Sequence, residues 1–178
     1  MSKHWRRLTA NEIEMARRVF SNGIDYARVK IYHGIPYLPG INVAIAPNGH
    51  IYFPRQNCPA DFALAGHSYQ MWLIHELTHV WQHQLGFKTW WAGILLTAVG
   101  GYVRRKAYVY PPPHTIQHFS DLNMEQQADL LAHYYAAHYL PHNPHSHHLP
   151  AFQTVLHPFL DNPLQRQLLP RYRCFIII

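Results

Sequence analysis

The chain contains the sequence His-Glu-Leu-Thr-His at residues 75–79, inside a stretch (residues 66–85) whose apolar residues recur with a helical period. On a helix, His75 and His79 lie one turn apart on the same face, about 6 Å from each other. That spacing lets both imidazoles bind a single Zn²⁺ at about 2.0–2.1 Å. Glu76 follows the first histidine, where it can take a proton from the zinc-bound water as a general base.

A catalytic zinc site needs a third protein ligand and an open coordination position. The metzincin pattern would place a third histidine at position 85, which is Leu85 in this chain. We therefore expect Glu125, near the start of the next strongly helical segment, to be the third ligand. Asp129 lies four residues further on the same helix face, where it can accept the other ring N–H of His75 or His79. The sequence predicts a Zn²⁺ site with this outer carboxylate.

The composition is that of a folded protein with an unusually low charge. Among 178 residues, 48% are hydrophobic, 13% are charged and 16 are histidines. The net charge of +6 suits an anionic partner, but the basic residues are scattered and no nucleic-acid motif is present, so no nucleic acid is expected as a partner. We expect one domain (residues 1–140) and a Pro/His-rich C-terminal extension (residues 141–178) that packs on or wraps the domain.

Capping and turn signals predict the elements before the motif. Thr9-Ala10-Asn11-Glu12 is a capping-box pattern that begins a helix. Alternating apolar residues predict strands over residues 26–32 and 41–45, and Asn48-Gly49 predicts a hairpin turn into residues 51–53. The expected result is a small antiparallel sheet.

The segments after the motif are predicted with less regular patterns. Trp90–Val103 is apolar and is followed by the basic triplet Arg104-Arg105-Lys106, but it is too short to span a bilayer. A buried helix or hairpin is one interpretation, and an interfacial membrane contact is the other. Ala107–Tyr110 reads as a strand, and residues 120–140 read as a helix.

Two stretches resemble a known family. His75–Gln82 and Asn123–Asp129 are similar to the zincin metallopeptidase effectors of type VI secretion. These effectors occur as C-terminal toxin domains of VgrG spike proteins and as free-standing Vgr/Rhs-associated proteins. The resemblance extends over residues 8–140 and includes Ala16–Phe20 and Pro47–Phe53.

The resemblance implies an α+β, gluzincin-like fold with a small antiparallel sheet, an active-site helix and a second helix that bears a ligand. It implies zinc ligation by His75, His79 and Glu125, with Glu76 as the catalytic residue. It also implies an antibacterial toxin that acts in the periplasm of a target bacterium and is paired with an immunity protein. Because no signal peptide or spike domain precedes the motif, we expect cytoplasmic synthesis and type VI secretion on a separate VgrG spike or other carrier.

Several residues keep open alternatives. His118, Tyr134 and Tyr108 are candidates to stabilise the oxyanion of a zincin reaction, or they serve only in packing. The C-terminal extension contains a histidine cluster that either binds a second metal ion or forms a solvated tail. Its members are His142, His145, His147 and His148. Cys58 and Cys174 are candidates for a disulfide, and the apolar end Phe175–Ile178 is expected to dock as a strand.

Three functions compete. The first is a zinc metallopeptidase toxin, whose substrate is a periplasmic protein or the peptide stem of peptidoglycan. The second is a non-hydrolytic membrane- or envelope-binding effector with a structural zinc site, motivated by Trp90–Val103. The third is a cytosolic housekeeping peptidase. Glu76→Gln separates the first from the second, because a structural zinc site tolerates the change.

Overall fold

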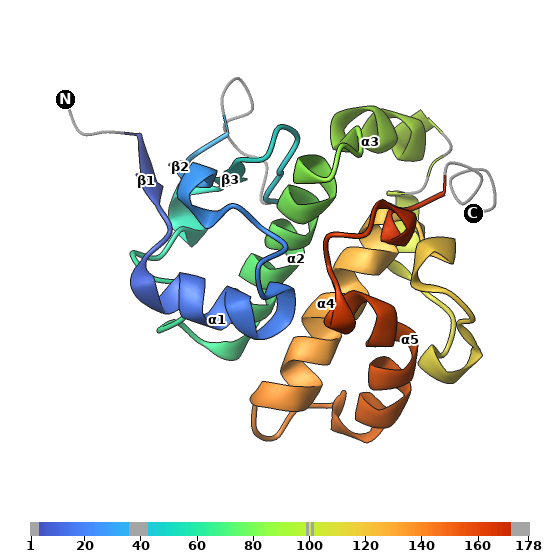
Figure 1. The fold of residues 1–178 in the computed structure, drawn as a ribbon. Coiled ribbons are helices and arrows are strands. Elements are labelled where there is room, and N and C mark those ends of the chain that lie inside the picture. The colour runs from blue at the N-terminus through green and yellow to red at the C-terminus, as the bar shows by residue number, and fades with distance from the viewer. Residues whose placement is uncertain (1–3, 36–42, 99, 101, 172–178) are drawn as a thin grey trace.

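The computed structural model describes residues 4–35, 43–98, 100 and 102–171. The strands are β1 (Trp5–Arg7), β2 (Lys30–His33) and β3 (Ile51–Phe53). The helices are α1 (Ala10–Phe20), α2 (His67–Gln84), α3 (Thr89–Ala98), α4 (Met124–Tyr139) and α5 (Leu149–Asp161). Figure 1 shows α2 between two groups of elements, with the sheet and α1 on one side and α4 and α5 on the other. The predicted α+β class is confirmed.

Helix α1 begins at the predicted capping box. The Thr9 hydroxyl accepts a hydrogen bond from the Glu12 amide at 3.1 Å, and the Glu12 carboxylate accepts one from the Thr9 amide at 2.9 Å. The same carboxylate is fully buried and receives two hydrogen bonds from the Arg6 guanidinium, at 2.7 and 2.8 Å. It also accepts the Phe62 amide at 2.9 Å. One buried glutamate therefore joins β1, α1 and the loop before α2.

The sheet differs from the expectation, which was wholly antiparallel. β1 pairs with β2 in the antiparallel sense, but β2 pairs with β3 in the parallel sense, with Ile31 opposite Ile51. The expectation was wrong for this pairing because the chain between β2 and β3 is a long connection, which lets β3 return in the same direction. The predicted hairpin at Asn48-Gly49 is reduced to one antiparallel bridge between Ile45 and Tyr52. The predicted strand over residues 41–45 lies partly outside the described residues.

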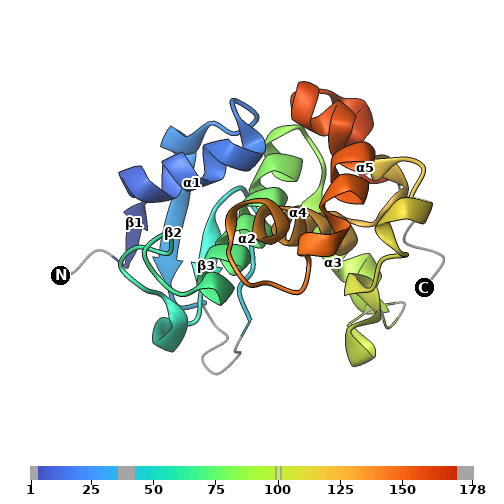
Figure 2. The same ribbon diagram turned by 90° about the horizontal axis from the view of Figure 1, so that it is seen from below.

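The predicted strand at Ala107–Tyr110 is also wrong. Residues Val103–Tyr108 form a 3₁₀ helix, and the Val109 amide closes it on the Lys106 carbonyl at 3.2 Å. A strand needs a neighbouring strand for its hydrogen bonds. Figures 1 and 2 place this segment across α2 from the sheet, where no partner strand is available among the described residues.

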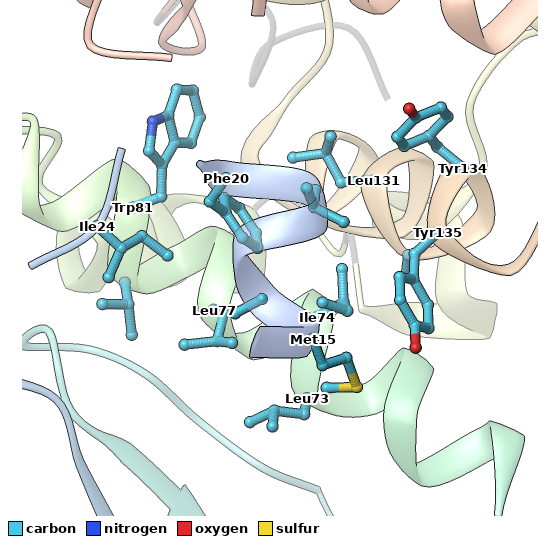
Figure 3. Close-up of a cluster of buried hydrophobic side chains, with 14 of the residues drawn as sticks. Met15, Phe20, Ile24, Leu73, Ile74, Leu77, Trp81, Leu131, Tyr134 and Tyr135 are labelled. Atoms are coloured by element: carbon cyan, nitrogen blue, oxygen red, sulfur yellow. The ribbon is translucent and has the colours of Figure 1, made fainter. Parts of the chain in front are cut away.

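The two long helices carry the core. α2 and α4 pack along each other, and α2 also contacts the sheet. Figure 3 shows the side chains that fill the space between α1, α2 and α4, among them Phe20, Leu77 and Trp81. α2 is buried on nearly all sides over its second half, which explains its long run of apolar residues around the motif. The helix ends where predicted, with Gly86 at a positive φ of 96°.

The C-terminal extension contains a regular element that the sequence pattern did not predict. Leu149–Asp161 forms α5, and its buried Phe159 packs edge-on against Trp81 at 5.1 Å and Phe20 at 6.0 Å between ring centroids. The Trp81 indole N–H donates to the Pro163 carbonyl at 2.8 Å. The extension therefore shares the main core. In the part of the chain that the structure describes, no helix has the length and apolar character needed to cross a membrane.

Candidate metal centre

Two helices bring the predicted ligands together. His75 and His79 lie on the face of α2 that meets α4, and Glu125 lies in the first turn of α4. α4 begins at Met124, later than expected, because the Asn123 side chain caps it by accepting the amides of Glu125 and Gln126 at 2.9 and 3.0 Å. Because the cap sets where α4 begins, it also sets the direction in which the Glu125 side chain leaves the first turn.

The three ligand atoms form a nearly equilateral triangle. The Nε2 atoms of His75 and His79 are 3.2 Å apart, and each is 3.2 Å from Oε2 of Glu125. In the described part of the chain, these three residues bring their ligand atoms close enough together to hold one metal ion. Tetrahedral ligands about 2.0–2.1 Å from zinc are about 3.3–3.4 Å apart, so the triangle fits this ion. The predicted ligand set is therefore brought together by the fold.

The outer hydrogen bonds direct both imidazoles toward the centre of that triangle. His75 donates from Nδ1 to the Asp129 carboxylate at 2.8 Å, as predicted for Asp129. His79 donates from Nδ1 to the side-chain oxygen of Gln82 at 2.9 Å. In each neutral ring this leaves the lone pair on Nε2. With both rings neutral, three acceptor atoms face one another, an arrangement that favours a cation between them.

Gln82 belongs to a buried amide chain that the sequence analysis missed. Its side-chain NH₂ donates to Gln127 at 3.0 Å and to the Met124 carbonyl at 3.2 Å. Gln127 donates in turn to the carbonyls of Phe119 and Leu168, both at 2.9 Å. Both glutamines are fully buried. The available signal was a polar residue three positions after the second histidine, which shares its face on a helix.

Tyr102 is the second residue that the sequence analysis missed. Its hydroxyl donates to Oε1 of Glu125 at 2.8 Å, which leaves Oε2 for the metal. Burial and the neighbouring Glu125 carboxylate raise the pKa of Tyr102, so the phenol keeps its proton. Of the three predicted oxyanion candidates, Tyr108 lies nearby, with its ring centroid 6.0 Å from that of His75.

The other two oxyanion candidates lie elsewhere. Tyr134 is buried in the core (Figure 3). Its hydroxyl pairs with His138 at 3.1 Å. His118 is exposed before a short 3₁₀ helix. Neither observation connects these residues with the metal ligands.

Glu76 has the surroundings of a general base. It is 3% exposed, and no hydrogen-bond partner reaches its Oε2 from the described part of the chain. Burial raises its pKa, although the neighbouring histidines oppose the shift. A buried carboxylate oxygen without a partner is costly for a folded protein and is typical of a functional site. The atom is free to bind a water or a substrate proton.

The ligands polarise one another. Burial alone would raise the pKa of Glu125, but the charge of His79 and the hydrogen bonds from both histidines hold that pKa well below its ordinary value. Burial alone would lower the pKa of His75, but Asp129 and Glu125 raise it well above its ordinary value. Burial alone would lower the pKa of His79, but Glu125 outweighs burial and raises that pKa above its ordinary value. The site thus favours positive charge among the ligands.

Within the described ranges, the histidines of the extension form no comparable cluster of metal ligands. His145 stacks on His133 at 3.9 Å and His147 packs on His148 at 3.8 Å between ring centroids, as aromatic pairs. Cys58 is half-buried. Its predicted partner Cys174 and the predicted strand Phe175–Ile178 lie outside the described residues.

Comparison with known proteins places the chain in a family. It is similar to the type VI secretion system spike protein VgrG2b of Pseudomonas aeruginosa, with 38% identity over 141 residues. The match covers 73% of this chain but 13% of the spike protein, so the chain spans a small part of that relative. The solved effector domain of VgrG2b is 31% identical with a TM-score of 0.68, and the match covers 85% of this chain and 82% of that domain.

No family model matches the chain. The likeness in sequence and structure to the effector domain defines its class: the chain belongs to the family of the VgrG2b effector domain. The match extends over most of both chains, so the likeness concerns the greater part of the fold.

Proposed function

We propose that the protein is a zinc-dependent metallopeptidase that acts as an antibacterial type VI secretion effector in the periplasm of a target cell. The observation that carries this proposal is the triangle of His75, His79 and Glu125 ligand atoms beside the buried, unpartnered Oε2 of Glu76. A structural site needs only ligands, whereas a hydrolytic site also needs a base that is free to take a proton. Glu76 supplies that base.

The residues of the site divide the chemistry among them. His75, His79 and Glu125 would hold the zinc, which when bound polarises the scissile carbonyl and lowers the pKa of the attacking water. Glu76 accepts the proton of that water at Oε2 and passes it to the nitrogen of the leaving amine. Its raised pKa suits both steps, because a base with a pKa nearer neutrality also returns the proton readily. Tyr102 and Asp129 keep the ligands oriented.

The route to the target rests on the family. Membership in the family of the VgrG2b effector domain supports delivery by type VI secretion with a VgrG spike or another carrier. Such a toxin requires a cognate immunity protein in the producing cell. We propose a peptide or protein substrate in the envelope, with the peptidoglycan stem peptide as one member of that class.

The test is expression in a susceptible bacterium with a periplasmic signal, beside a cytoplasmic version and the Glu76→Gln variant. Killing or shape change is expected from the periplasmic wild type alone. Loss of a general base reduces a reaction by about 10²–10⁴-fold, so Glu76→Gln is expected to be harmless while it retains bound zinc. Equal toxicity of the zinc-loaded Glu76→Gln protein would refute the hydrolytic function.

A non-hydrolytic envelope-binding effector with a structural zinc is the second candidate. It is favoured by the exposed apolar side chains of α3, with Trp90 50% and Trp91 47% exposed. This candidate predicts toxicity that is independent of Glu76 and lost when the apolar residues are replaced. The same expression experiment therefore separates the two functions.

A further inference from the structure

Helix α3 is apolar on the side that faces solvent as well as on the side that faces the protein. Ala92 and Leu96 are buried in a small cluster with Phe87, Ala107 and Met124. The opposite side carries four large apolar residues that are between 42% and 50% exposed, namely Trp90, Trp91, Ile94 and Leu95. We call these four residues the α3 outer face. A surface helix normally presents polar residues there.

The α3 outer face is a continuous patch. Its members are spaced as neighbours along one side of a helix, and the indole rings of Trp90 and Trp91 stack with centroids 4.5 Å apart. Val103, the first residue of the 3₁₀ helix after α3, is 62% exposed. Figure 1 places α3 at the periphery, away from the sheet and α1. Contiguous exposed apolar patches of this kind mark interaction surfaces.

The charged residues next to α3 along the chain are all basic. Lys88 lies just before the helix and Lys106 lies after it, and both are exposed. From Leu77 to Ser120 the sequence contains no Asp or Glu, while Arg104 and Arg105 add two further basic residues. Of the two carboxylates that flank this stretch, Glu76 is buried at 3% exposure and Asp121 is paired with Arg171 at 2.8 Å. The surface thus combines tryptophans, branched aliphatic side chains and positive charge.

We propose that the α3 outer face docks the protein on the surface of an anionic phospholipid bilayer. Tryptophan favours the headgroup level of a membrane, and lysines beside an apolar helix face are attracted to anionic lipids. A second copy of the chain fits less well, because symmetric pairing through this face would bring the lysines of both copies together. The docking does not require the proposed hydrolysis.

The helix that carries the docking surface adjoins the candidate metal centre through another of its sides. A Cβ atom added at Gly93 of α3 would lie 3.8 Å from the Tyr102 hydroxyl, which itself contacts Glu125. Docking would therefore hold the metal centre beside the lipid headgroups. One consequence, which rests on the proposed function, is a preference for substrates anchored to the membrane.

The experiment measures binding of the full chain to vesicles of phosphatidylglycerol and phosphatidylethanolamine, with phosphatidylcholine vesicles for comparison. Co-sedimentation and the blue shift of tryptophan fluorescence give the partition coefficient. We expect binding to the anionic vesicles that weakens with salt, and at least a tenfold lower partition coefficient for the double variant Trp90→Ser, Trp91→Ser. Lys88→Gln combined with Lys106→Gln is expected to lose the preference for anionic lipid.

Matched controls keep the result specific to α3. Leu164 is 50% exposed elsewhere on the surface, so Leu164→Ser is expected to bind vesicles like the wild type. Glu76→Gln is also expected to bind normally, which separates docking from hydrolysis. Thermal unfolding of each variant establishes that it is folded.

Two outcomes would overturn the proposal. One is wild-type protein that stays in solution with anionic vesicles, or a Trp90→Ser, Trp91→Ser variant that binds them equally well. The other is a dimer, detected by light scattering, that dissociates in this variant while vesicle binding is absent. That result would assign the α3 outer face to self-association.

Discussion

At the scale of single residues, Gln82 determines how His79 presents its lone pair. Gln82→Leu removes the acceptor of the His79 N–H and frees the ring to rotate or change tautomer. Loss of such an outer hydrogen bond typically lowers metal affinity about 10–100-fold. Competition with a chromophoric chelator measures this loss.

Gln84 provides the control on the same helix. Its side chain hydrogen-bonds the backbone of Asp25, at 2.7 and 3.2 Å, and faces away from the metal ligands. Gln84→Leu is expected to leave zinc affinity unchanged. If both variants bind zinc with wild-type affinity, the amide chain through Gln82 serves packing alone.

Zinc binding is expected to release protons. Burial opposes protonation of His75, but its hydrogen bonds to Asp129 and Glu125 outweigh burial and raise its pKa well above the ordinary value. At neutral pH the metal-free ring therefore holds a proton that zinc must displace. Calorimetry in buffers of different ionisation heat is expected to show at least one proton released per zinc. Asp129→Asn is expected to release fewer, and equal release by both proteins would contradict this account of His75.

The stability of the metal-free protein is expected to depend on pH in two directions. Glu125 has a lowered folded-state pKa. Its contribution to folding stability is therefore present above its unfolded pKa and is lost as the pH falls through the folded value. His75 and His79 have raised folded-state pKa values. Their contribution to folding stability is therefore present below the unfolded pKa and is lost as the pH rises through the folded value. Chelation of zinc is therefore expected to destabilise the protein more at alkaline than at neutral pH, as urea unfolding would measure.

At the scale of elements, Glu12 joins β1 to α1. Glu12→Gln removes one charge of a buried ion pair with Arg6, which typically costs about 3–5 kcal/mol in the free energy of unfolding. On the same helix, Glu14 forms an exposed pair with Arg18 at 3.2 Å. Glu14→Gln is expected to change the same free energy by less than about 1 kcal/mol. Denaturant unfolding measures the free energy of unfolding of both variants. An equally small decrease in both would show that the pair of Arg6 and Glu12 does not hold β1 in place.

At the scale of the whole molecule, α5 completes the core around Trp81. Phe159→Ala removes a fully buried ring that contacts Trp81, Phe20 and Phe119, and such changes typically cost about 3–5 kcal/mol. The exposed His157 on the same helix is the control, with an expected change within about 0.5 kcal/mol for His157→Ala.

Truncation after Leu140 tests the predicted boundary between the domain and its extension. The cut removes α5 and exposes Trp81, Phe119 and Phe20, so the shortened chain is expected to lose its cooperative unfolding transition and its zinc site. Circular dichroism and zinc content measure both. A folded, zinc-binding chain of residues 1–140 would show instead that α5 is an independent addition.

Local sequence signals are sufficient to predict the helices that hold the candidate metal centre. The interval between His75 and His79, the capping box at Thr9 and Glu12, and the C-terminal Gly86 are local signals, and local hydrogen bonds and helical periodicity are sufficient to produce them. The placement of Glu125 and Asp129 beside the two histidines was also predictable, because zinc chemistry restricts which residue types complete such a site.

Only the tertiary structure decided the rest. The parallel pairing of β2 with β3, the 3₁₀ helix at Val103–Tyr108 and the place of α5 in the core depend on which segments pack together across long stretches of chain. The sequence did not predict the contacts of Gln82 with His79 and of Tyr102 with Glu125 for the same reason. Local sequence sets the period and ends of an element, but its neighbours are chosen by burial of apolar surface over the whole fold.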